Sequence, residues 1–340
     1  MNEQSEQSIT VIGAGVIGLC CARTLQRRGY GVTVIDPLDP GMGTSYGNAG
    51  ILATGSVLPE GKPGLWKRVP GMLLDPLGPL TIRPSYLAKL TPWMLRFIAN
   101  TTAKRSEEIS QALASIVLPG LEHYRALLDD VASDEVPIRQ QGCLYLYPSA
   151  ANLAAARDDI ETRRQRGVAL EMLSPDEVRQ LVPAIGPDMA GGALATQSGH
   201  ATSPLALSQL LAARIVADGG NFIKAKASGF AIGSDGPTHV HTDQGDIPVR
   251  AVVVAAGAFS KPLAKSLGNT VPLDTERGYH MMLPQPGIDL RVPMLINAHG
   301  YAVTPMQDGI RLAGTVEFAG TEAAPNYARA DVLLKRARKL

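Results

Sequence analysis

A glycine-rich turn near the start of the chain constrains its fold more than any other feature. Residues 9–12 (ITVI) are a short β-branched run, and they are followed by the pattern GAGVIG at 13–18 and then by helical periodicity. These runs predict a buried strand, a tight turn and a helix. A second apolar run at 31–35 predicts the next strand, which ends at Asp36. Strand, glycine turn, helix, strand and terminal acid are together typical of a unit that binds an adenine dinucleotide.

Each residue of this unit has a physical task in binding a dinucleotide. Gly13 permits the tight turn, Gly15 lets a pyrophosphate approach the backbone, and Gly18 allows the helix to pack closely on the strand. The amino end of the helix attracts the phosphate charge. Asp36 accepts the ribose hydroxyls and would repel the 2′-phosphate of NADP, so FAD and NAD remain. The expected contacts are Gly13, Ala14, Gly15, Val16, Ile17, Gly18 and Asp36.

Length and composition place this unit in an ordinary globular protein of two domains. The chain has 340 residues, of which 45% are hydrophobic and 19% charged, and its formal net charge is +1. A near-neutral chain has no global field that attracts nucleic acid, so no such partner is expected. The three cysteines form no C-x-x-C pair, the amino end does not resemble a signal peptide, and no apolar run approaches the roughly 18 residues of a spanning helix. We therefore expect a cytoplasmic protein.

A loop of small residues follows Asp36, where an NAD domain would continue with another strand. It contains Ser45 and Asn48, and a later buried run at 251–260 turns at a glycine. In both segments the chain resembles the D-amino-acid oxidase-like superfamily of FAD enzymes, which implies FAD as the cofactor. The further cofactor contacts that the resemblance implies are Ser45, Asn48, Ala49, Gly50, Ala227, Ala256 and Gly257.

Four stretches resemble the bacterial D-amino-acid dehydrogenase branch more closely, including its D-hydroxyproline dehydrogenase-like members. They are SYGNAG at 45–50, DPLGPLTIRP at 75–84, WMLRF at 93–97 and TERGYH at 275–280. The resemblance implies oxidation of a D-amino acid, with D-proline and D-hydroxyproline among the candidates. Hydride would leave the α-carbon for flavin N5, and the imine would be released or hydrolyse to a 2-oxo acid. Oxygen and a quinone both stay open as the electron acceptor.

The segment from Arg277 to His280 supplies most of the candidate catalytic residues. The resemblance implies a cation for the substrate carboxylate, and Arg277 is the candidate because a guanidinium can bind a carboxylate in bidentate fashion. Tyr279, His280 and Tyr301 are candidates for lining the substrate pocket or hydrogen bonding to the substrate. Two plainer interpretations stay open: Arg277 in a surface ion pair and Tyr279 as a core aromatic residue. After Pro305, where superfamily members often carry an arginine, this chain has a methionine.

The expected architecture is an α/β fold with α+β insertions. It combines a discontinuous, Rossmann-like FAD-binding domain with a substrate domain built on a mixed or antiparallel sheet. The expected boundaries are 8–60 and 150–270 for the FAD-binding domain, 61–149 and 271–325 for the substrate domain, and 326–340 for a carboxyl-terminal helix. Periodicity predicts helices over 80–100, 107–131 and 203–217 and strands over 142–147 and 221–225.

The chain ends in a basic amphipathic helix, whereas the enzymes that it resembles continue through a segment containing glycine and histidine. This departure predicts a truncated family member that binds FAD weakly. An inactive remnant of such an enzyme is therefore one alternative function. An NAD-linked dehydrogenase, which the glycine turn and Asp36 also allow, is the other.

Two histidines of a predicted strand raise the question of a metal. His239 and His241 share one face of that strand, but no acid or cysteine nearby in the sequence completes a ligand set. No metal site is expected.

A basic stretch with tryptophan runs from Lys62 to Arg105. Its basic residues are accompanied by one acid, Asp75, and both tryptophans of the chain, Trp66 and Trp93, lie in it. This combination is typical of a peripheral contact with a membrane surface. The plainer interpretation is a set of solvated helix faces with the tryptophans in the core.

Overall fold

The computed structural model describes residues 8–340 except 66–68, 70, 72–77, 79 and 133. The chain forms two compact units. Unit 1 comprises the residues up to Gly47 together with Ala126–Pro137 and Pro204–Asp274, and unit 2 comprises Asn48–Arg125, Ile138–Ser203 and Thr275–Leu340. Both units are therefore discontinuous in sequence.

The two units divide the chain at other positions than the expected domain boundaries. Segments 48–60 and 150–203, which the sequence places in the FAD-binding domain, lie in unit 2. Strand pairing explains part of this difference. Strand β8 (Gly191–Ala195) pairs antiparallel with β6 (Cys143–Tyr147), so it extends a sheet of unit 2.

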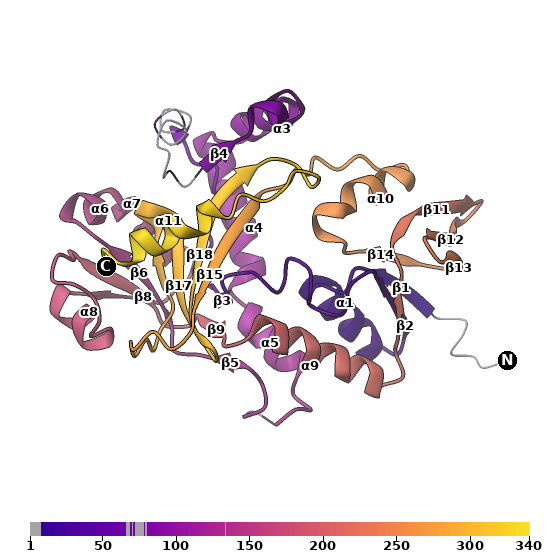
Figure 1. The fold of residues 1–340 in the computed structure, drawn as a ribbon, viewed down its shortest axis with the longest axis horizontal. Helices are drawn as coiled ribbons and strands as arrows, with labels where there is room; N and C mark the ends of the chain where they lie inside the picture. Colours follow the sequence, from indigo (N-terminus) through magenta and orange to yellow (C-terminus); the bar gives the residue numbers. More distant parts are fainter. Residues whose placement is uncertain (1–7, 66–68, 70, 72–77, 79, 133) are drawn as a thin grey trace. The chain divides into compact units, whose positions relative to one another are not determined.

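Unit 1 is built on a parallel sheet with the strand order β10-β2-β1-β14 (Figure 1). Its elements are β1 (Ser8–Ile12), α1 (Val16–Arg27), β2 (Gly31–Asp36), α9 (Pro204–Ala217), β10 (Asn221–Lys224) and β14 (Val252–Val254). The strands are rich in β-branched residues, and Val11 and Val34 are fully buried. Because these four strands run in one direction, their carboxyl ends gather at one edge of the sheet.

A small antiparallel sheet and a short helix complete unit 1. These elements are β11 (Ala227–Gly233), β12 (Gly236–Thr242), β13 (Gly245–Pro248), the 3-10 turn η3 (Gly257–Phe259) and α10 (Ser260–Ser266). Phe230 of β11 and Leu263 of α10 pack with Ile12 and Ile35 in one apolar cluster. The small sheet is therefore held against the carboxyl ends of β1 and β2.

Unit 2 is built on a mixed sheet with the order β15-β18-β17-β16-β6-β8-β7, and β4 pairs in parallel with β18. Its other strands are β4 (Leu80–Ile82), β7 (Leu170–Leu173), β15 (Arg277–Leu283), β16 (Met294–Ile296), β17 (Tyr301–Met306) and β18 (Gly309–Phe318); η4 (Asn297–His299) joins β16 to β17. Three short strands form a separate sheet: β3 (Ile51–Leu52), β5 (Ile138–Arg139) and β9 (Gly199–Ala201).

Each face of the large sheet has its own apolar core. Leu144 of β6 faces one core, which includes residues of α8 (Pro175–Leu181) and α11 (Ala328–Ala337). Tyr145 faces the other core, which includes residues of α4 (Ala103–Val117), α6 (Ala150–Ala155) and α7 (Arg157–Gln165). Alternation along the strand accounts for the division, because successive side chains point to opposite faces.

Prolines interrupt two of the predicted helices, whereas the helix predicted over 203–217 is confirmed as α9. Over 80–100 the α-helix is α3 (Leu87–Ala99); β4 and the 3-10 turn η2 (Pro84–Tyr86) precede it, because Pro84 keeps Arg83 extended. Over 107–131 the chain forms α4 and α5 (Gly120–Leu127), with a proline between them. The prediction of one continuous helix over each of these ranges is wrong.

No helix in the described part of the chain is long and apolar enough to cross a membrane. Of the basic stretch with tryptophan seen in the sequence, Trp66, Lys67, Arg68 and Asp75 lie outside the described residues. Trp93 packs inward on its aromatic neighbours.

Candidate active site

The turn after β1 requires glycine at two of its positions. Gly13 has φ +114°, and a β-carbon there would overlap the carbonyl oxygen of Ala255 at the end of the neighbouring strand. A β-carbon on Gly18 would overlap the carbonyl oxygen of Gly13. Helix α1 therefore lies directly against the turn, with its amino end at the carboxyl edge of the parallel sheet.

Gly15 leaves space in front of the first turn of α1. A β-carbon on Gly15 would have one neighbour within 4 Å, the Ser45 hydroxyl oxygen at 3.2 Å. That hydroxyl accepts a hydrogen bond of 2.9 Å from the backbone N–H of Val16. Ser45 thus lies at the amino end of α1, and its oxygen is held in place by the helix. A polar group with little bulk and a helix amino end suit a phosphate ligand.

Asp36 ends β2 beside this turn. Its Oδ2 accepts a hydrogen bond of 2.7 Å from the N–H of Ala14, and its Oδ1 accepts one of 2.8 Å from the N–H of Leu38. The side chain is half-buried, and each carboxylate oxygen keeps acceptor capacity for a further donor. Asp36 can therefore hold the turn and accept ribose hydroxyls at the same time.

The other predicted cofactor residues of unit 1 lie just after strands that end at the same edge of the sheet. Ala256 and Gly257 follow β14, and Ala256 lies next to Gly13. Ala227 begins β11, two residues after Ala225, whose N–H donates to the Asp36 carbonyl. The glycine turn, Ser45, Asp36 and these segments form one cradle, and their donors and acceptors fit an adenine dinucleotide.

The predicted contacts Asn48, Ala49 and Gly50 belong to unit 2. Asn48 Oδ1 accepts a hydrogen bond of 2.7 Å from the N–H of Gly50, and the Gly50 carbonyl accepts one from Ala201. Arg311 of β18 donates from Nη1 to the Asn48 carbonyl at 2.9 Å. This buried arginine was not among the predicted site residues. A charged residue inside the otherwise apolar run 309–314 is the signal that could have found it.

Arg277 and Tyr279 converge on one buried acid, Glu317. The Tyr279 hydroxyl donates to Glu317 Oε2 and accepts a hydrogen bond of 2.8 Å from the N–H of Asn326. Arg83 donates to Glu317 Oε1 at 2.7 Å, and Arg277 Nη1 lies 3.6 Å from Oε2. Burial acts to raise the pKa of Glu317, but the Tyr279 hydrogen bond and the two arginines outweigh it and hold the pKa below its usual value. Glu317 and Arg83 were not among the predicted site residues either. They are distant in the sequence, and only the folded chain brings them together.

Tyr279 and Tyr301 lie on the same face of the sheet with β18 between them, and His280 lies on the opposite face. Tyr279 and Tyr301 both pair with Gly314, where a β-carbon would be too close to Tyr301. Burial raises the pKa of Tyr301. His280 points the other way by strand alternation. Its pKa is lowered by burial and by the charge of Arg311. The structure thus brings three of the four predicted catalytic residues to one face of the sheet.

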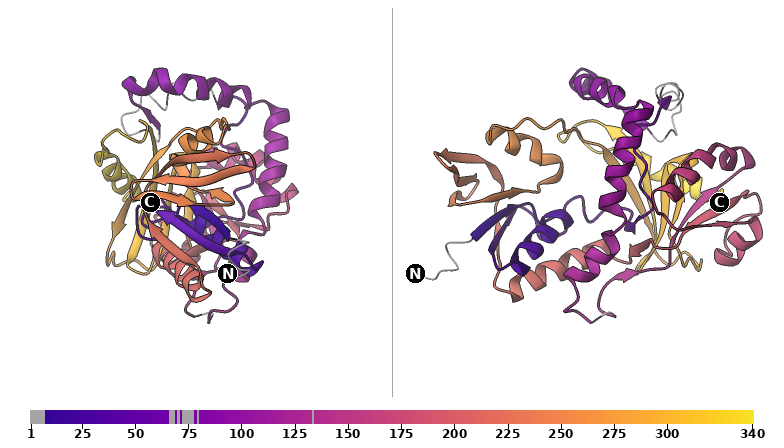
Figure 2. Two further views of the ribbon diagram at one scale, coloured as in Figure 1. Left: turned by 90° about the vertical axis from the view of Figure 1, so that its right-hand side faces the viewer. Right: turned by 180° about the vertical axis from the view of Figure 1, so that it is seen from behind.

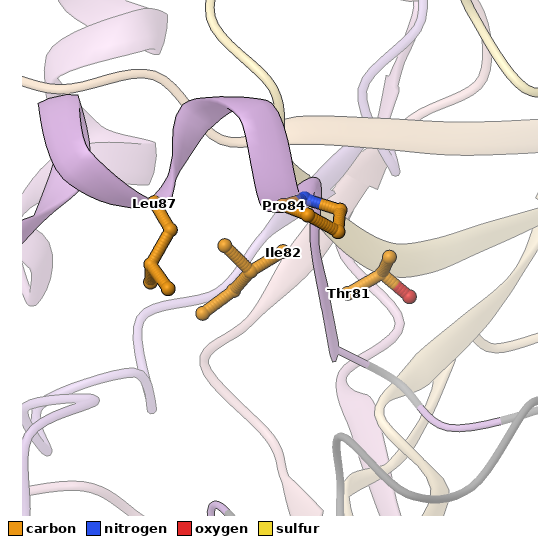
Figure 3. A pocket seen from close by; sticks show the side chains of 4 residues that line it. All are labelled: Thr81, Ile82, Pro84 and Leu87. Carbon is orange, nitrogen blue, oxygen red and sulfur yellow. The ribbon is translucent and has the colours of Figure 1, made fainter.

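A small open pocket lies elsewhere in unit 2 (Figure 3). Thr81, Ile82, Pro84 and Leu87 line it, and Arg329 of α11 donates to the Thr81 hydroxyl. None of these residues is a predicted site residue, and the lining offers little charge for catalysis.

His241 has an acid partner only five residues further along the chain. Its Nδ1 lies 2.8 Å from Asp246 Oδ1 on the adjacent strand β13. Within the described ranges, no three histidine, cysteine, aspartate or glutamate residues are grouped so that they could hold a metal ion.

The cradle of unit 1 defines the class of this protein as a dinucleotide-binding α/β protein. Over residues 8–340 the chain matches the family described as FAD dependent oxidoreductase, and it belongs to that family. FAD is its cofactor. The family decides between the two dinucleotides that the sequence left open, so the alternative of an NAD-linked dehydrogenase is wrong.

Two curated relatives cover most of the chain. The D-amino-acid oxidase of Bradyrhizobium diazoefficiens is 39% identical over 330 residues, which are 96% of this chain and 77% of that protein. The D-amino acid dehydrogenase of Rhizobium rhizogenes is 29% identical over 334 residues, which are 96% of this chain and 79% of that protein.

Two solved structures share the fold. Glycine oxidase from Geobacillus kaustophilus has a TM-score of 0.65 and 20% identity, covering 98% of this chain and 77% of its own. The L-proline dehydrogenase from P. horikoshii has a TM-score of 0.64 and 17% identity, covering 97% of this chain and 76% of its own. These similarities confirm the expected flavoenzyme fold.

Proposed function

We propose that this protein oxidises D-amino acids to imines, which are released or hydrolyse to 2-oxo acids. The observation that carries the proposal is the 39% identity with a D-amino-acid oxidase over nearly the whole chain. The cradle around Gly15, Ser45 and Asp36 supports it, because it supplies the dinucleotide site that this chemistry needs. D-Proline and D-hydroxyproline are the first substrates to test.

FAD, when bound, supplies the acceptor for the hydride that leaves the substrate α-carbon. The residues of this chain must then bind the carboxylate, orient the α-carbon and keep the amine neutral. A buried site favours the neutral amine, because burial disfavours the charged form. No general base is required for this step.

We propose Arg277 as the carboxylate ligand, with Tyr279 and Tyr301 on the same face of the sheet around the substrate. Two observations support Arg277: its side chain is 22% exposed, and its Nη1 makes no hydrogen bond to any described residue. Glu317 neutralises part of its charge, so a substrate carboxylate would share the guanidinium with that acid. Arg311, on the opposite face of the sheet with His280, is the alternative.

Steady-state kinetics of three variants decide between the two arginines. Arg277→Met is expected to raise the KM for D-amino acids roughly tenfold to hundredfold, the cost of a lost charged hydrogen bond, with bound FAD unchanged. Arg83→Met is the matched control, since it also removes an ion pair from Glu317. A raised KM in Arg311→Met alone would place the carboxylate site on the other face.

The overall reaction is tested with the purified protein. Extraction should release FAD, and D-amino acids should reduce it faster than their L-enantiomers do. Activity with dissolved oxygen alone identifies an oxidase, and activity only with a quinone or a dye identifies a dehydrogenase. The proposal would be contradicted if the protein binds FAD but neither enantiomer of any amino acid reduces it.

A further inference from the structure

We propose that Glu317 is a positioning residue for the oxidation, because it fixes the direction of the Tyr279 hydroxyl. With this direction fixed, the phenol oxygen recognises the substrate by accepting a hydrogen bond from the N–H of its amine. The inference rests on the proposed function. It deepens that function, because it assigns the side chain that recognises the substrate nitrogen and favours primary and secondary amines over tertiary ones.

Glu317 is an ionised acid inside unit 2. It lies on β18 opposite Arg277 of β15, and its side chain is 2% exposed. Helix α11 packs against both strands (Figures 1 and 2). Burial raises the pKa of Glu317, but the hydrogen bonds from Tyr279 and Arg83 and the charges of Arg83 and Arg277 outweigh it. The carboxylate is therefore ionised at neutral pH and has no proton to donate.

The hydrogen bonds around the Tyr279 hydroxyl have only one possible direction. Because Glu317 is an acceptor alone, the Tyr279 O–H must donate to its Oε2. The backbone N–H of Asn326 donates to the same hydroxyl oxygen at 2.8 Å. The single proton of Tyr279 is thus already used, and what its oxygen still offers a ligand is a lone pair.

This direction divides the recognition of the substrate between two side chains. Tyr279 has no proton for a substrate carboxylate, so that group falls to Arg277, whose guanidinium only donates. An amine nitrogen that carries a hydrogen can donate to the Tyr279 oxygen. Arg277 is itself held by Glu317 at 3.6 Å and by the Gly320 carbonyl, to which its Nη2 donates at 3.3 Å.

The substrate nitrogen is also the atom whose charge changes during the reaction. When the hydride leaves the α-carbon with its electron pair for FAD, the lone pair of the neutral amine forms the C=N bond, and the nitrogen becomes positive. The N–H on that nitrogen then becomes a stronger donor. A phenol oxygen that accepts this N–H and itself donates to a carboxylate stabilises the new charge. Through Tyr279, Glu317 therefore acts more strongly on the transition state than on the bound substrate.

Reduction of the bound flavin in a single turnover without oxygen tests the inference on the full chain with its FAD. The substrates are D-proline, which keeps one N–H as the neutral amine, and N-methyl-D-proline, which has none. D-Alanine and N,N-dimethyl-D-alanine make the same comparison for a primary amine. The unchanged protein should reduce its flavin roughly tenfold to hundredfold faster with the substrate that carries the N–H.

Two variants should lose this preference to different extents. Tyr279→Phe should lose most of it, because only the N–H substrate becomes slower. Glu317→Gln should lose part of it, because the amide oxygen keeps the hydrogen bond but not the charge. In both variants the limiting rate should fall more than the half-saturating concentration changes, as expected for an interaction that strengthens in the transition state.

Matched controls are Tyr147→Phe, which changes another buried tyrosine of the same sheet, and Glu171→Gln, which changes an exposed acid. They should keep the preference, and all variants should keep their FAD at the assay temperature. An equal preference in Tyr279→Phe and the unchanged protein would overturn the inference, and so would an equal loss in Tyr147→Phe. If the unchanged protein oxidises no amine at all, the proposed function fails and the inference fails with it.

Discussion

At the scale of single residues, Gly15 is the position where a side chain would harm cofactor binding more than folding. Its added β-carbon would meet the Ser45 hydroxyl at 3.2 Å, whereas at Gly13 and Gly18 it would overlap backbone. Gly15→Val should therefore fold and lose its FAD, because the side chain fills the space before the helix amino end. Flavin absorbance per mole of purified protein measures this. Gly120→Val, where a β-carbon has open space in unit 2, is the control; stoichiometric FAD in Gly15→Val would contradict the assignment.

The Asp36 carboxylate is predicted to contribute directly to adenosine binding. Asp36→Ala leaves ribose hydroxyls without a charged acceptor, which should weaken FAD binding by about 1–3 kcal/mol. Asp36→Asn keeps one acceptor oxygen and should lose less. Titration of the apoprotein with FAD gives the Kd values. Equal Kd values for the Ala variant and the unchanged protein would show that Asp36 serves the turn alone, through its bonds to Ala14 and Leu38.

At the scale of elements, Glu317 ties β18 to β15 and to the chain before α3 through Tyr279, Arg277 and Arg83. Its pKa is lower in the folded chain than its usual value. Its ionised form therefore stabilises the fold fully at neutral pH, and this contribution is lost as the pH falls through the lowered pKa.

Glu317→Gln should accordingly lower the free energy of unfolding by about 1–3 kcal/mol at pH 7, as expected when charged hydrogen bonds in a buried site are lost. The difference from the unchanged protein should shrink toward acidic pH. Denaturant titrations at several pH values measure it, with the exposed Glu171→Gln as control. A difference that stays constant down to acidic pH would mean that Glu317 acts by shape and not by charge.

At the scale of the whole molecule, the chain passes repeatedly between its two units. The parallel sheet of unit 1 needs β10 and β14, which lie beyond residue 220 and flank β2 and β1. A fragment of residues 1–125 contains the entire glycine turn and Asp36 but lacks both flanking strands. We expect its glycine turn to be unfolded, because β1, β2 and α1, the only regular elements of unit 1 that the fragment holds among the described residues, bury too little apolar surface without β10 and β14. Circular dichroism and a thermal melt test this; a cooperative melt with bound FAD would contradict it.

The sequence by itself determined the parts of this protein that depend on neighbours along the chain. The run ITVI, the glycines 13–18 and Asp36 predict β1, the turn, α1 and β2, because periodicity and backbone freedom are local properties. The same residues predicted the turn and the acid of the cofactor cradle, whereas the family resemblance predicted Ser45, Ala227, Ala256 and Gly257. The hydrogen bond between Ser45 and Val16 depends on the folded loop. The prolines at the helix boundaries are also visible in the sequence, but the predictions of continuous helices over 80–100 and 107–131 did not take them into account.

The tertiary structure alone decided what depends on strand pairing. Tyr279 and Glu317 are 38 residues apart, and they meet because β15 pairs with β18 in one register. Arg83 joins them because β4, which directly precedes it, pairs with Val316–Phe318 at the end of β18. Likewise Arg311 reaches the Asn48 carbonyl across 263 residues, and β8 joins unit 2 by pairing with β6. Such contacts depend on the order and register of strands, which hydrophobic pattern leaves open when many pairings bury the same residues.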